Sequence, residues 1–131
     1  MKIRAYEHVG IRVSDRDEAL AFYSRLGFVE DEYFPDYPAN EMVSEEGVRI
    51  NLIFNGKRRE GGTNILFDET VKHPGMTHPA FVVDDLGALE TLCAQHGIPV
   101  TEGPIDIGER RRALFIRDPD GNVLEFDEYL N

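Results

Sequence analysis

Two stretches of the chain, His8-Val-Gly-Ile-Arg-Val-Ser-Asp15 and His78-Pro-Ala-Phe-Val-Val-Asp-Asp85, decide the fold because they begin two copies of one unit. With an offset of 70 residues, histidine matches histidine, valine matches valine and aspartate matches aspartate. Each stretch is followed by a helical pattern that ends at a glycine, Gly27 in the first copy and Gly97 in the second. Self-similarity at a fixed spacing indicates a duplicated structural unit.

Each copy is predicted to form a strand, a helix and three further strands. Alternating β-branched residues indicate the strands, and a serine or aspartate before an apolar helical pattern indicates where each helix begins. The expected strands are 5–13, 28–34, 40–44, 48–54, 78–84, 98–102, 111–117 and 122–129, and the expected helices follow Ser14 or Asp15 up to Leu26 and cover 86–96. The expected fold class is α+β: two βαβββ modules form curled mixed sheets around a central cavity, with the helices on the outside.

The chain is expected to form a single domain over residues 1–131. Its length suits one compact domain with a full core. Module 1 is expected at about 1–55 and module 2 at about 77–131. Glycine and proline residues between them predict a loop-like linker at about 56–76.

Composition excludes several kinds of partner. The formal net charge of −11 disfavours nucleic acid and anionic membranes, with Arg110-Arg111-Arg112 as the one basic cluster. No apolar run reaches the length of a membrane span, and no signal segment begins the sequence, so a cytoplasmic location is expected. The single cysteine, Cys93, is expected to be a buried, inert thiol on the apolar face of a helix.

Strand alternation brings ligand-type side chains onto shared faces. His8 and Glu125 alternate with apolar residues along their strands, and His78 is equivalent to His8 in the second copy. Two curled sheets would let these three side chains converge on one centre. Two imidazoles and one carboxylate match a known divalent-metal pattern with open positions. The sequence therefore predicts a metal site, whereas His73 and His96 are expected at the surface.

These motifs resemble the vicinal-oxygen-chelate superfamily, which includes glyoxalase I, type I extradiol dioxygenases and the bleomycin-resistance proteins. The resemblance rests on His8-Val-Gly-Ile-Arg-Val, Leu26-Gly-Phe, His78-Pro-Ala-Phe-Val-Val-Asp and Arg117-Asp-Pro-Asp-Gly-Asn-Val-Leu-Glu125. It spans almost the whole chain except the linker. The motifs are specific for the superfamily but not for one reaction, because this fold supports several chemistries.

The resemblance implies a ligand set and two substrate contacts. The implied metal ligands are His8, Asn51, His78 and Glu125, and zinc, nickel, manganese and iron(II) are the candidate ions. Arg12 and Asn55 are the implied contacts for an anionic part of the substrate. Glyoxalase I usually carries a carboxylate where this chain has asparagine. The asparagine leaves a net positive site, which favours an anionic substrate that chelates through two oxygens.

Three readings of the function follow. The first is a glyoxalase I-like lyase or isomerase, in which the metal polarises a carbonyl group and Glu125 moves a proton as the catalytic base. The alternative is an Fe(II) extradiol-type dioxygenase, although Phe115 occupies the strand where those enzymes use a tyrosine. A fosfomycin-type transferase fits less well, because Gly10 stands where a threonine is usual. The third reading is a non-catalytic drug-binding or resistance protein.

The resemblance also implies the partners. A small-molecule substrate is expected. A homodimer is also expected, because the small members of the superfamily that this chain resembles form dimers and twofold dimers are the commonest oligomers.

Overall fold

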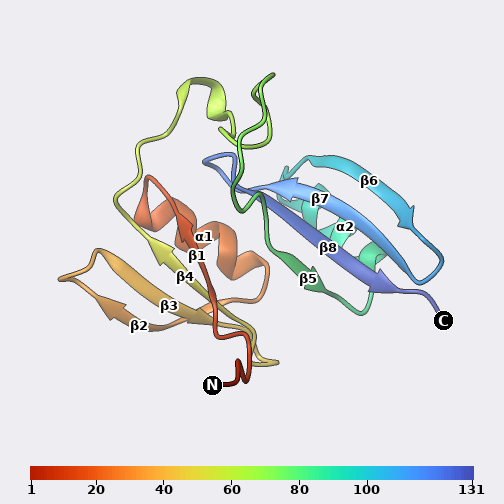
Figure 1. Ribbon diagram of the computed structural model, residues 1–131, viewed down its shortest axis with the longest axis horizontal. Helices are drawn as coiled ribbons and strands as arrows, with labels where there is room; N and C mark the ends of the chain where they lie inside the picture. Colours follow the sequence, from red (N-terminus) through yellow and green to blue (C-terminus); the bar gives the residue numbers. More distant parts are fainter. The chain divides into compact units, whose positions relative to one another are not determined.

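A computed structural model describes residues 1–131, which form two compact units, Met1–Glu60 and Gly61–Asn131. Each unit contains one four-stranded sheet and one helix, in the order strand, helix and three strands (Figure 1). The predicted α+β fold with two βαβββ modules is confirmed.

The sheet of unit 1 (Met1–Glu60) pairs the first strand of the unit with its last strand. Its elements are β1 (Val9–Arg12), α1 (Arg16–Arg25), β2 (Val29–Phe34), β3 (Ala39–Val43) and β4 (Arg49–Ile53). The strand order is β1-β4-β3-β2, with β1 parallel to β4 and the other pairs antiparallel. The parallel pair places Gly10 opposite Asn51.

Unit 2 (Gly61–Asn131) repeats this topology. Its strands and helix are β5 (Ala80–Val82), α2 (Leu86–Gln95), β6 (Val100–Ile107), β7 (Arg111–Arg117) and β8 (Val123–Tyr129); a single 3-10 turn, η1 (Glu60–Gly62), lies at the junction with unit 1. The order is β5-β8-β7-β6, and β5 is parallel to β8. Ala80 pairs with Glu125 as Gly10 pairs with Asn51. Asn51 and Glu125 are therefore equivalent positions of the two sheets.

The helix boundaries follow the local sequence signals. The Asp15 carboxylate caps α1 by accepting from the Glu18 backbone N–H at 2.9 Å, and the Asp85 carboxylate caps α2 by accepting from the Ala88 N–H at 3.1 Å. After each helix the chain turns through a glycine in the left-handed region, with φ of 97° at the first and 66° at the second.

Each unit has its own core between sheet and helix. In unit 1, Ile50 and Leu52 on β4 are fully buried, as is Tyr23 on α1. In unit 2 the core residues of the two central strands and α2 are Leu114, Ile116, Leu124, Phe126, Leu86 and Cys93. The prediction of a buried cysteine is confirmed, and burial raises the pKa of the Cys93 thiol, which keeps it protonated and inert.

Three strands differ in extent from the expectation. β1 begins at Val9 rather than at residue 5, and β5 begins at Ala80 rather than at residue 78. Before β5, Pro79 has no N–H to donate to a strand ladder, although its carbonyl accepts from the Glu125 N–H at 3.1 Å. β6 runs on to Ile107, well beyond the expected end at residue 102. As a result, His8 directly precedes β1, and His78 lies two residues before the first residue of β5.

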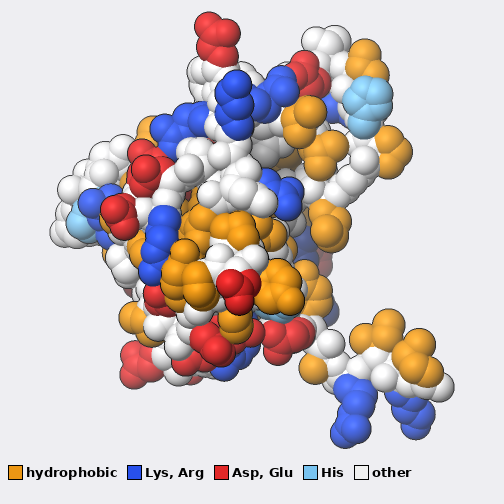
Figure 2. Space-filling model, turned by 90° about the vertical axis from the view of Figure 1, so that its left-hand side faces the viewer, with side chains coloured by type: hydrophobic (Ala, Val, Ile, Leu, Met, Phe, Trp, Pro, Cys, Tyr) orange, Lys and Arg blue, Asp and Glu red, His pale blue; other side chains and the backbone are white.

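The surface carries mixed charge. Acidic and basic side chains are interspersed around a group of hydrophobic ones on the face shown in Figure 2. The exposed apolar residues of unit 1 include Val29, Tyr33 and Val48. Neither helix is long and apolar enough to span a membrane.

Candidate metal and substrate site

A histidine and a glutamate meet at the start of β5 in unit 2. The Nε2 atom of His78 lies 3.0 Å from the Oε1 atom of Glu125. The parallel pairing of β5 with β8 produces this contact, because the backbone N–H of Glu125 donates to the residue that follows His78. Glu125 is only 7% exposed, whereas the His78 side chain is 24% exposed. The pair is therefore partly accessible to a ligand, mainly through the His78 side chain.

Neighbouring side chains fix the imidazole of His78. The Thr77 hydroxyl lies 2.8 Å from Nδ1 and donates to it when Nε2–H donates to the Glu125 carboxylate. In the other tautomer the hydroxyl would accept from Nδ1–H, and the Nε2 lone pair would be available to a metal. The rings of Phe67 and Phe115 meet the imidazole edge to face, with centroid distances of 6.0 and 5.4 Å. Two aromatic rings and the Thr77 hydroxyl therefore contact this imidazole.

A second buried carboxylate lies beside Glu125. Asp127 is two residues further along β8, so both carboxylates are on one face of the sheet. Burial and the neighbouring Glu125 carboxylate raise the pKa of Asp127 to about 6, while Arg111 and His78 oppose the shift. Arg111 Nε lies 3.3 Å from one oxygen of Asp127, and the other oxygen is buried without a hydrogen bond. This part of unit 2 concentrates negative charge.

The equivalent position of unit 1 holds an unpartnered amide oxygen. Asn51 occupies on β4 the place that Glu125 occupies on β8. Its Oδ1 atom is buried and has no hydrogen-bond partner. A buried acceptor without a donor is unfavourable, so such an atom often has a ligand or a functional role. Asn51 has the free oxygen that a weak metal ligand or a water-binding group needs.

His8 is more open than its counterpart in the second unit. Its side chain is 37% exposed, and Nδ1 lies 3.1 Å from a carboxylate oxygen of Glu7. No group of three or more histidine, cysteine, aspartate or glutamate side chains is arranged in the chain to hold a metal ion. The structure joins His78 to Glu125, and the convergence of His8 and Asn51 with that pair stays a prediction.

The two predicted substrate contacts lie together in unit 1. The Nε atom of Arg12, at the end of β1, donates to Oδ1 of Asn55 at 2.9 Å. Both side chains are at the surface, and the asparagine lies two residues after the end of β4. A guanidinium oriented by an amide oxygen is suited to bind a carboxylate or phosphate.

The His78–Glu125 pair fits a divalent ion. The Nε2 atom of His78 and the Oε1 atom of Glu125 lie 3.0 Å apart, so both ligand atoms would be within reach of one ion. A neutral imidazole and a carboxylate are ligands of the expected kind. The residues present therefore fit the implied metal.

Some residues at this site were not predicted from the sequence. Asp127 and Arg111 border the pair, and Phe67 from the linker contacts His78. The alternation along β8 was a sufficient signal for Asp127, because it shares the face of Glu125. No sequence period connects Phe67 with His78.

Comparison with known proteins agrees with this architecture. The family model described as the Glyoxalase/Bleomycin resistance protein/Dioxygenase superfamily matches residues 5–126. A glyoxalase domain-containing protein of Mycosarcoma maydis is 30% identical over 136 residues, which cover 98% of this chain and 70% of that protein. The lactoylglutathione lyase of Schizosaccharomyces pombe is 26% identical over 135 residues. That match covers 94% of this chain but only 44% of the yeast enzyme.

The fold is also found among solved structures. A glyoxalase family protein from Bacillus cereus superimposes with a TM-score of 0.75, covering 100% of this chain and 97% of the bacterial one. Its sequence identity is only 17%, so this likeness concerns the fold alone. The family model, by contrast, spans nearly the whole sequence together with the repeat motifs. The chain belongs to the Glyoxalase/Bleomycin resistance protein/Dioxygenase superfamily.

Proposed function

We propose that this protein is a metal-dependent lyase or isomerase of the glyoxalase type, acting on a small substrate that chelates through two oxygens. The observation that carries the proposal is the 3.0 Å contact between His78 Nε2 and the buried carboxylate of Glu125. A histidine and a glutamate from adjacent parallel strands supply two ligands and leave the remaining positions to other groups.

The proposed ligands come from both units. His8 and Asn51 of unit 1 complete the set with His78 and Glu125 of unit 2. A divalent ion held there supplies Lewis acidity, which makes the C–H bond beside a bound carbonyl group more acidic. The unpartnered Oδ1 of Asn51 supports its inclusion, since it has no competing donor to lose.

Other steps of the proposed reaction are assigned to individual side chains. Glu125 accepts the proton from the substrate carbon and returns it to the neighbouring carbon, as a general base and then a general acid. The Arg12 guanidinium, oriented by Asn55, binds the anionic end of the substrate away from the reacting carbon. Asp127 lies on the same face of β8 as this base, two residues further along the strand.

One observation weighs against the dioxygenase alternative. The aromatic ring next to His78 on β7 is Phe115, at 5.4 Å between centroids. A phenylalanine has no hydroxyl group and cannot transfer a proton to or from a catechol. The similarity to a yeast lactoylglutathione lyase supports the isomerase instead.

Metal analysis of protein purified without chelator tests the proposal. We expect about one divalent ion per chain in the wild type and loss of that ion in His78→Ala. His96→Ala is the matched control, because His96 is an exposed histidine at the end of α2. Unchanged metal content in His78→Ala would refute the proposal.

Turnover assays then separate the two reactions. Each metal form, with zinc, nickel, manganese or iron(II), is offered the adduct of methylglyoxal with a thiol and, separately, a catechol under oxygen. Isomerisation without ring cleavage supports the proposal, and rapid ring cleavage by the iron(II) form refutes it.

A further inference from the structure

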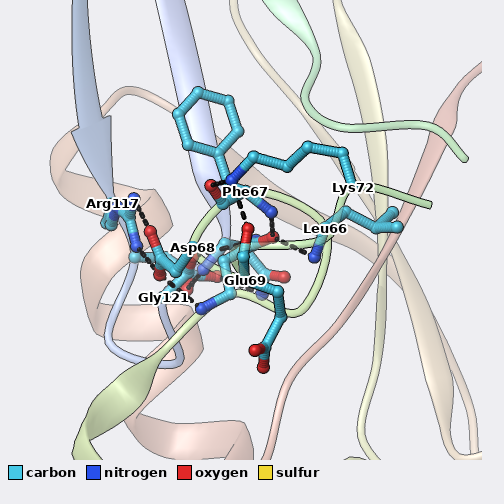
Figure 3. Close-up of polar contacts among 10 residues, drawn as sticks. Leu66, Phe67, Asp68, Glu69, Lys72, Arg117 and Gly121 are labelled. Atoms are coloured by element: carbon cyan, nitrogen blue, oxygen red, sulfur yellow. Dashed lines mark hydrogen bonds and ion pairs between the residues drawn. The ribbon is translucent and has the colours of Figure 1, made fainter. Parts of the chain in front are cut away.

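The linker segment that enters unit 2 is fixed to the end of β7 by a two-point ion pair. The two terminal nitrogens of Arg117 donate to the two oxygens of Asp68 at 2.5 and 2.7 Å (Figure 3). Both side chains are about a quarter exposed, at 25% and 28%. This parallel arrangement is specific to the planar guanidinium group, and lysine cannot reproduce it. The hydrogen bonds to Arg117 also hold the pKa of Asp68 well below its usual range.

A second residue joins the same segment to the turn between β7 and β8. The Asn64 side chain donates to the carbonyl of Gly121 at 3.1 Å, while its backbone N–H donates to Asp68 at 2.7 Å. The contact is close, since a Cβ atom on Gly121 would lie 2.1 Å from the carbonyl oxygen of Gly62. Residues 62–68 therefore lie tightly against this turn.

These contacts determine where the side chain of Phe67 lies. Phe67 directly precedes Asp68, and its backbone N–H donates to the Asn64 side-chain oxygen at 3.0 Å. The Arg117 guanidinium lies 5.6 Å from the centre of the Phe67 ring. The same ring meets the imidazole of His78 edge to face at 6.0 Å. Arg117 is thereby linked to His78 through a single aromatic side chain.

We propose that Arg117 and Asp68 form a positioning clamp, which holds Phe67 against His78 and so fixes the orientation of the imidazole. This part of the inference rests on the proposed function, in which His78 is a metal ligand. The clamp then determines the direction in which the His78 imidazole faces the metal. Ligand orientation by neighbouring groups contributes substantially to metal affinity. Phe67 acts on His78 by contact, and Arg117 and Asp68 act only through Phe67.

The structure provides a matched control for the clamp. Arg112 on β7 donates from Nε to Asp106 at 2.7 Å, an exposed ion pair of the same unit. Neither residue has a hydrogen bond, an ion pair or a ring contact with Phe67 or His78. Arg112→Lys therefore perturbs an arginine–aspartate pair of the same sheet without touching the clamp.

The first arm of the test follows the ring proton on Cε1 of His78 by NMR in metal-free protein at about pH 8.5, where free imidazole is neutral. The chain has four histidines, so His78→Gln assigns the signal. We expect Phe67→Leu to shift the signal because an adjacent aromatic ring is lost. Asp68→Asn and Arg117→Lys should shift it in the same direction, and Arg112→Lys should leave it in place.

Combining the variants shows whether the clamp acts through the ring. Adding Asp68→Asn to Phe67→Leu should produce no further shift of the His78 signal. An unchanged signal in both Asp68→Asn and Arg117→Lys would overturn the proposal, as would fully additive shifts in the double variant. Asp68→Asn keeps the shape of the side chain and one of its two oxygens, because an amide nitrogen replaces only the other oxygen. This variant therefore keeps the proposal testable if Arg117→Lys fails to fold.

The second arm measures zinc affinity by competition with a chelating dye. We expect Asp68→Asn and Arg117→Lys to bind zinc about tenfold more weakly than the wild type, and Arg112→Lys to be unchanged. A shifted His78 signal with wild-type zinc affinity would overturn the role of the clamp in metal binding. Failure of the wild type itself to bind zinc, nickel, manganese or iron(II) would refute the proposed function, and the NMR arm would still decide whether Arg117 and Asp68 position His78.

Discussion

Two asparagines in the sheet of unit 1 should respond in opposite ways to replacement by leucine. Asn51, on β4, has a buried oxygen without a hydrogen-bond partner. Asn40, on β3, is fully buried, and its amide bonds on both sides: Nδ2 donates to Glu30 at 2.8 Å, and Oδ1 accepts from the Leu52 N–H at 2.9 Å. The same chemical change therefore removes an unsatisfied acceptor at one position and two made hydrogen bonds at the other.

The expected magnitudes follow from the cost of an unpaired buried polar group. Such a group costs about 1–3 kcal/mol, so Asn51→Leu should raise the free energy of unfolding of the metal-free protein by about 1 kcal/mol. Asn40→Leu leaves the Leu52 N–H without an acceptor and should lower the same free energy by about 2–3 kcal/mol. If Asn51 also serves the metal, Asn51→Leu should weaken zinc binding by about tenfold or more.

Urea unfolding in the presence of a chelator measures the first quantity, and a zinc competition titration measures the second. A gain in stability together with a loss of zinc affinity is the combination expected when a protein retains an unfavourable group for function. The reasoning is wrong if Asn51→Leu lowers the free energy of unfolding of the metal-free protein, because the oxygen then has a partner whose loss matters.

Three further outcomes are expected. The raised pKa of Asp127, caused by burial and by Glu125 against the opposing Arg111 and His78, means that the folded protein keeps a proton that the unfolded chain releases between about pH 4 and pH 6. The contribution of this proton to stability is complete below that window and is lost as the pH rises through about 6. Asp127→Asn should therefore flatten the pH dependence of the free energy of unfolding, measured with urea in metal-free protein. An unaltered pH dependence contradicts this expectation. Asn51→Glu should keep or raise isomerisation of the methylglyoxal–thiol adduct by restoring a second carboxylate, and a fall in kcat shows instead that the reaction needs a more positive site. Light scattering should give a dimer, whereas a mass near 14.9 kDa at micromolar concentration corresponds to a monomer.

The repeat made most of the sheet architecture predictable. Once His8 is matched to His78, equivalent strands follow, and the structure confirms the equivalence in register. The N–H of Val13 donates to the carbonyl of Ile53 at 2.8 Å, and the N–H of Val83 donates to the carbonyl of Asp127 at the same distance. Local chemistry was sufficient here, because strand alternation and helix caps act over a few residues.

Contacts made by the linker were not predictable in this way. Asp68 and Arg117 are 49 residues apart, and neither lies in a pattern that has a period. The linker was expected to be a loop, which its glycine and proline content indicates, but composition does not reveal which surface a loop will contact. The same limit applies to β6, whose ladder with β7 continues to the pair Ile107–Arg111. Pairing with the neighbouring strand, rather than the residues of β6 themselves, sets that length.

The two copies have diverged at the positions where chemistry would differ. Opposite the start of the parallel strand, unit 2 has Glu125 where unit 1 has Asn51, and two residues later unit 2 has Asp127 where unit 1 has Ile53. Both buried carboxylates therefore belong to unit 2, while the exposed Arg12 of unit 1 has no basic counterpart at the equivalent position of β5. The proposed function gives Glu125 of unit 2 the proton transfer and Arg12 of unit 1 the anionic part of the substrate, and this difference between the copies is consistent with those separate roles.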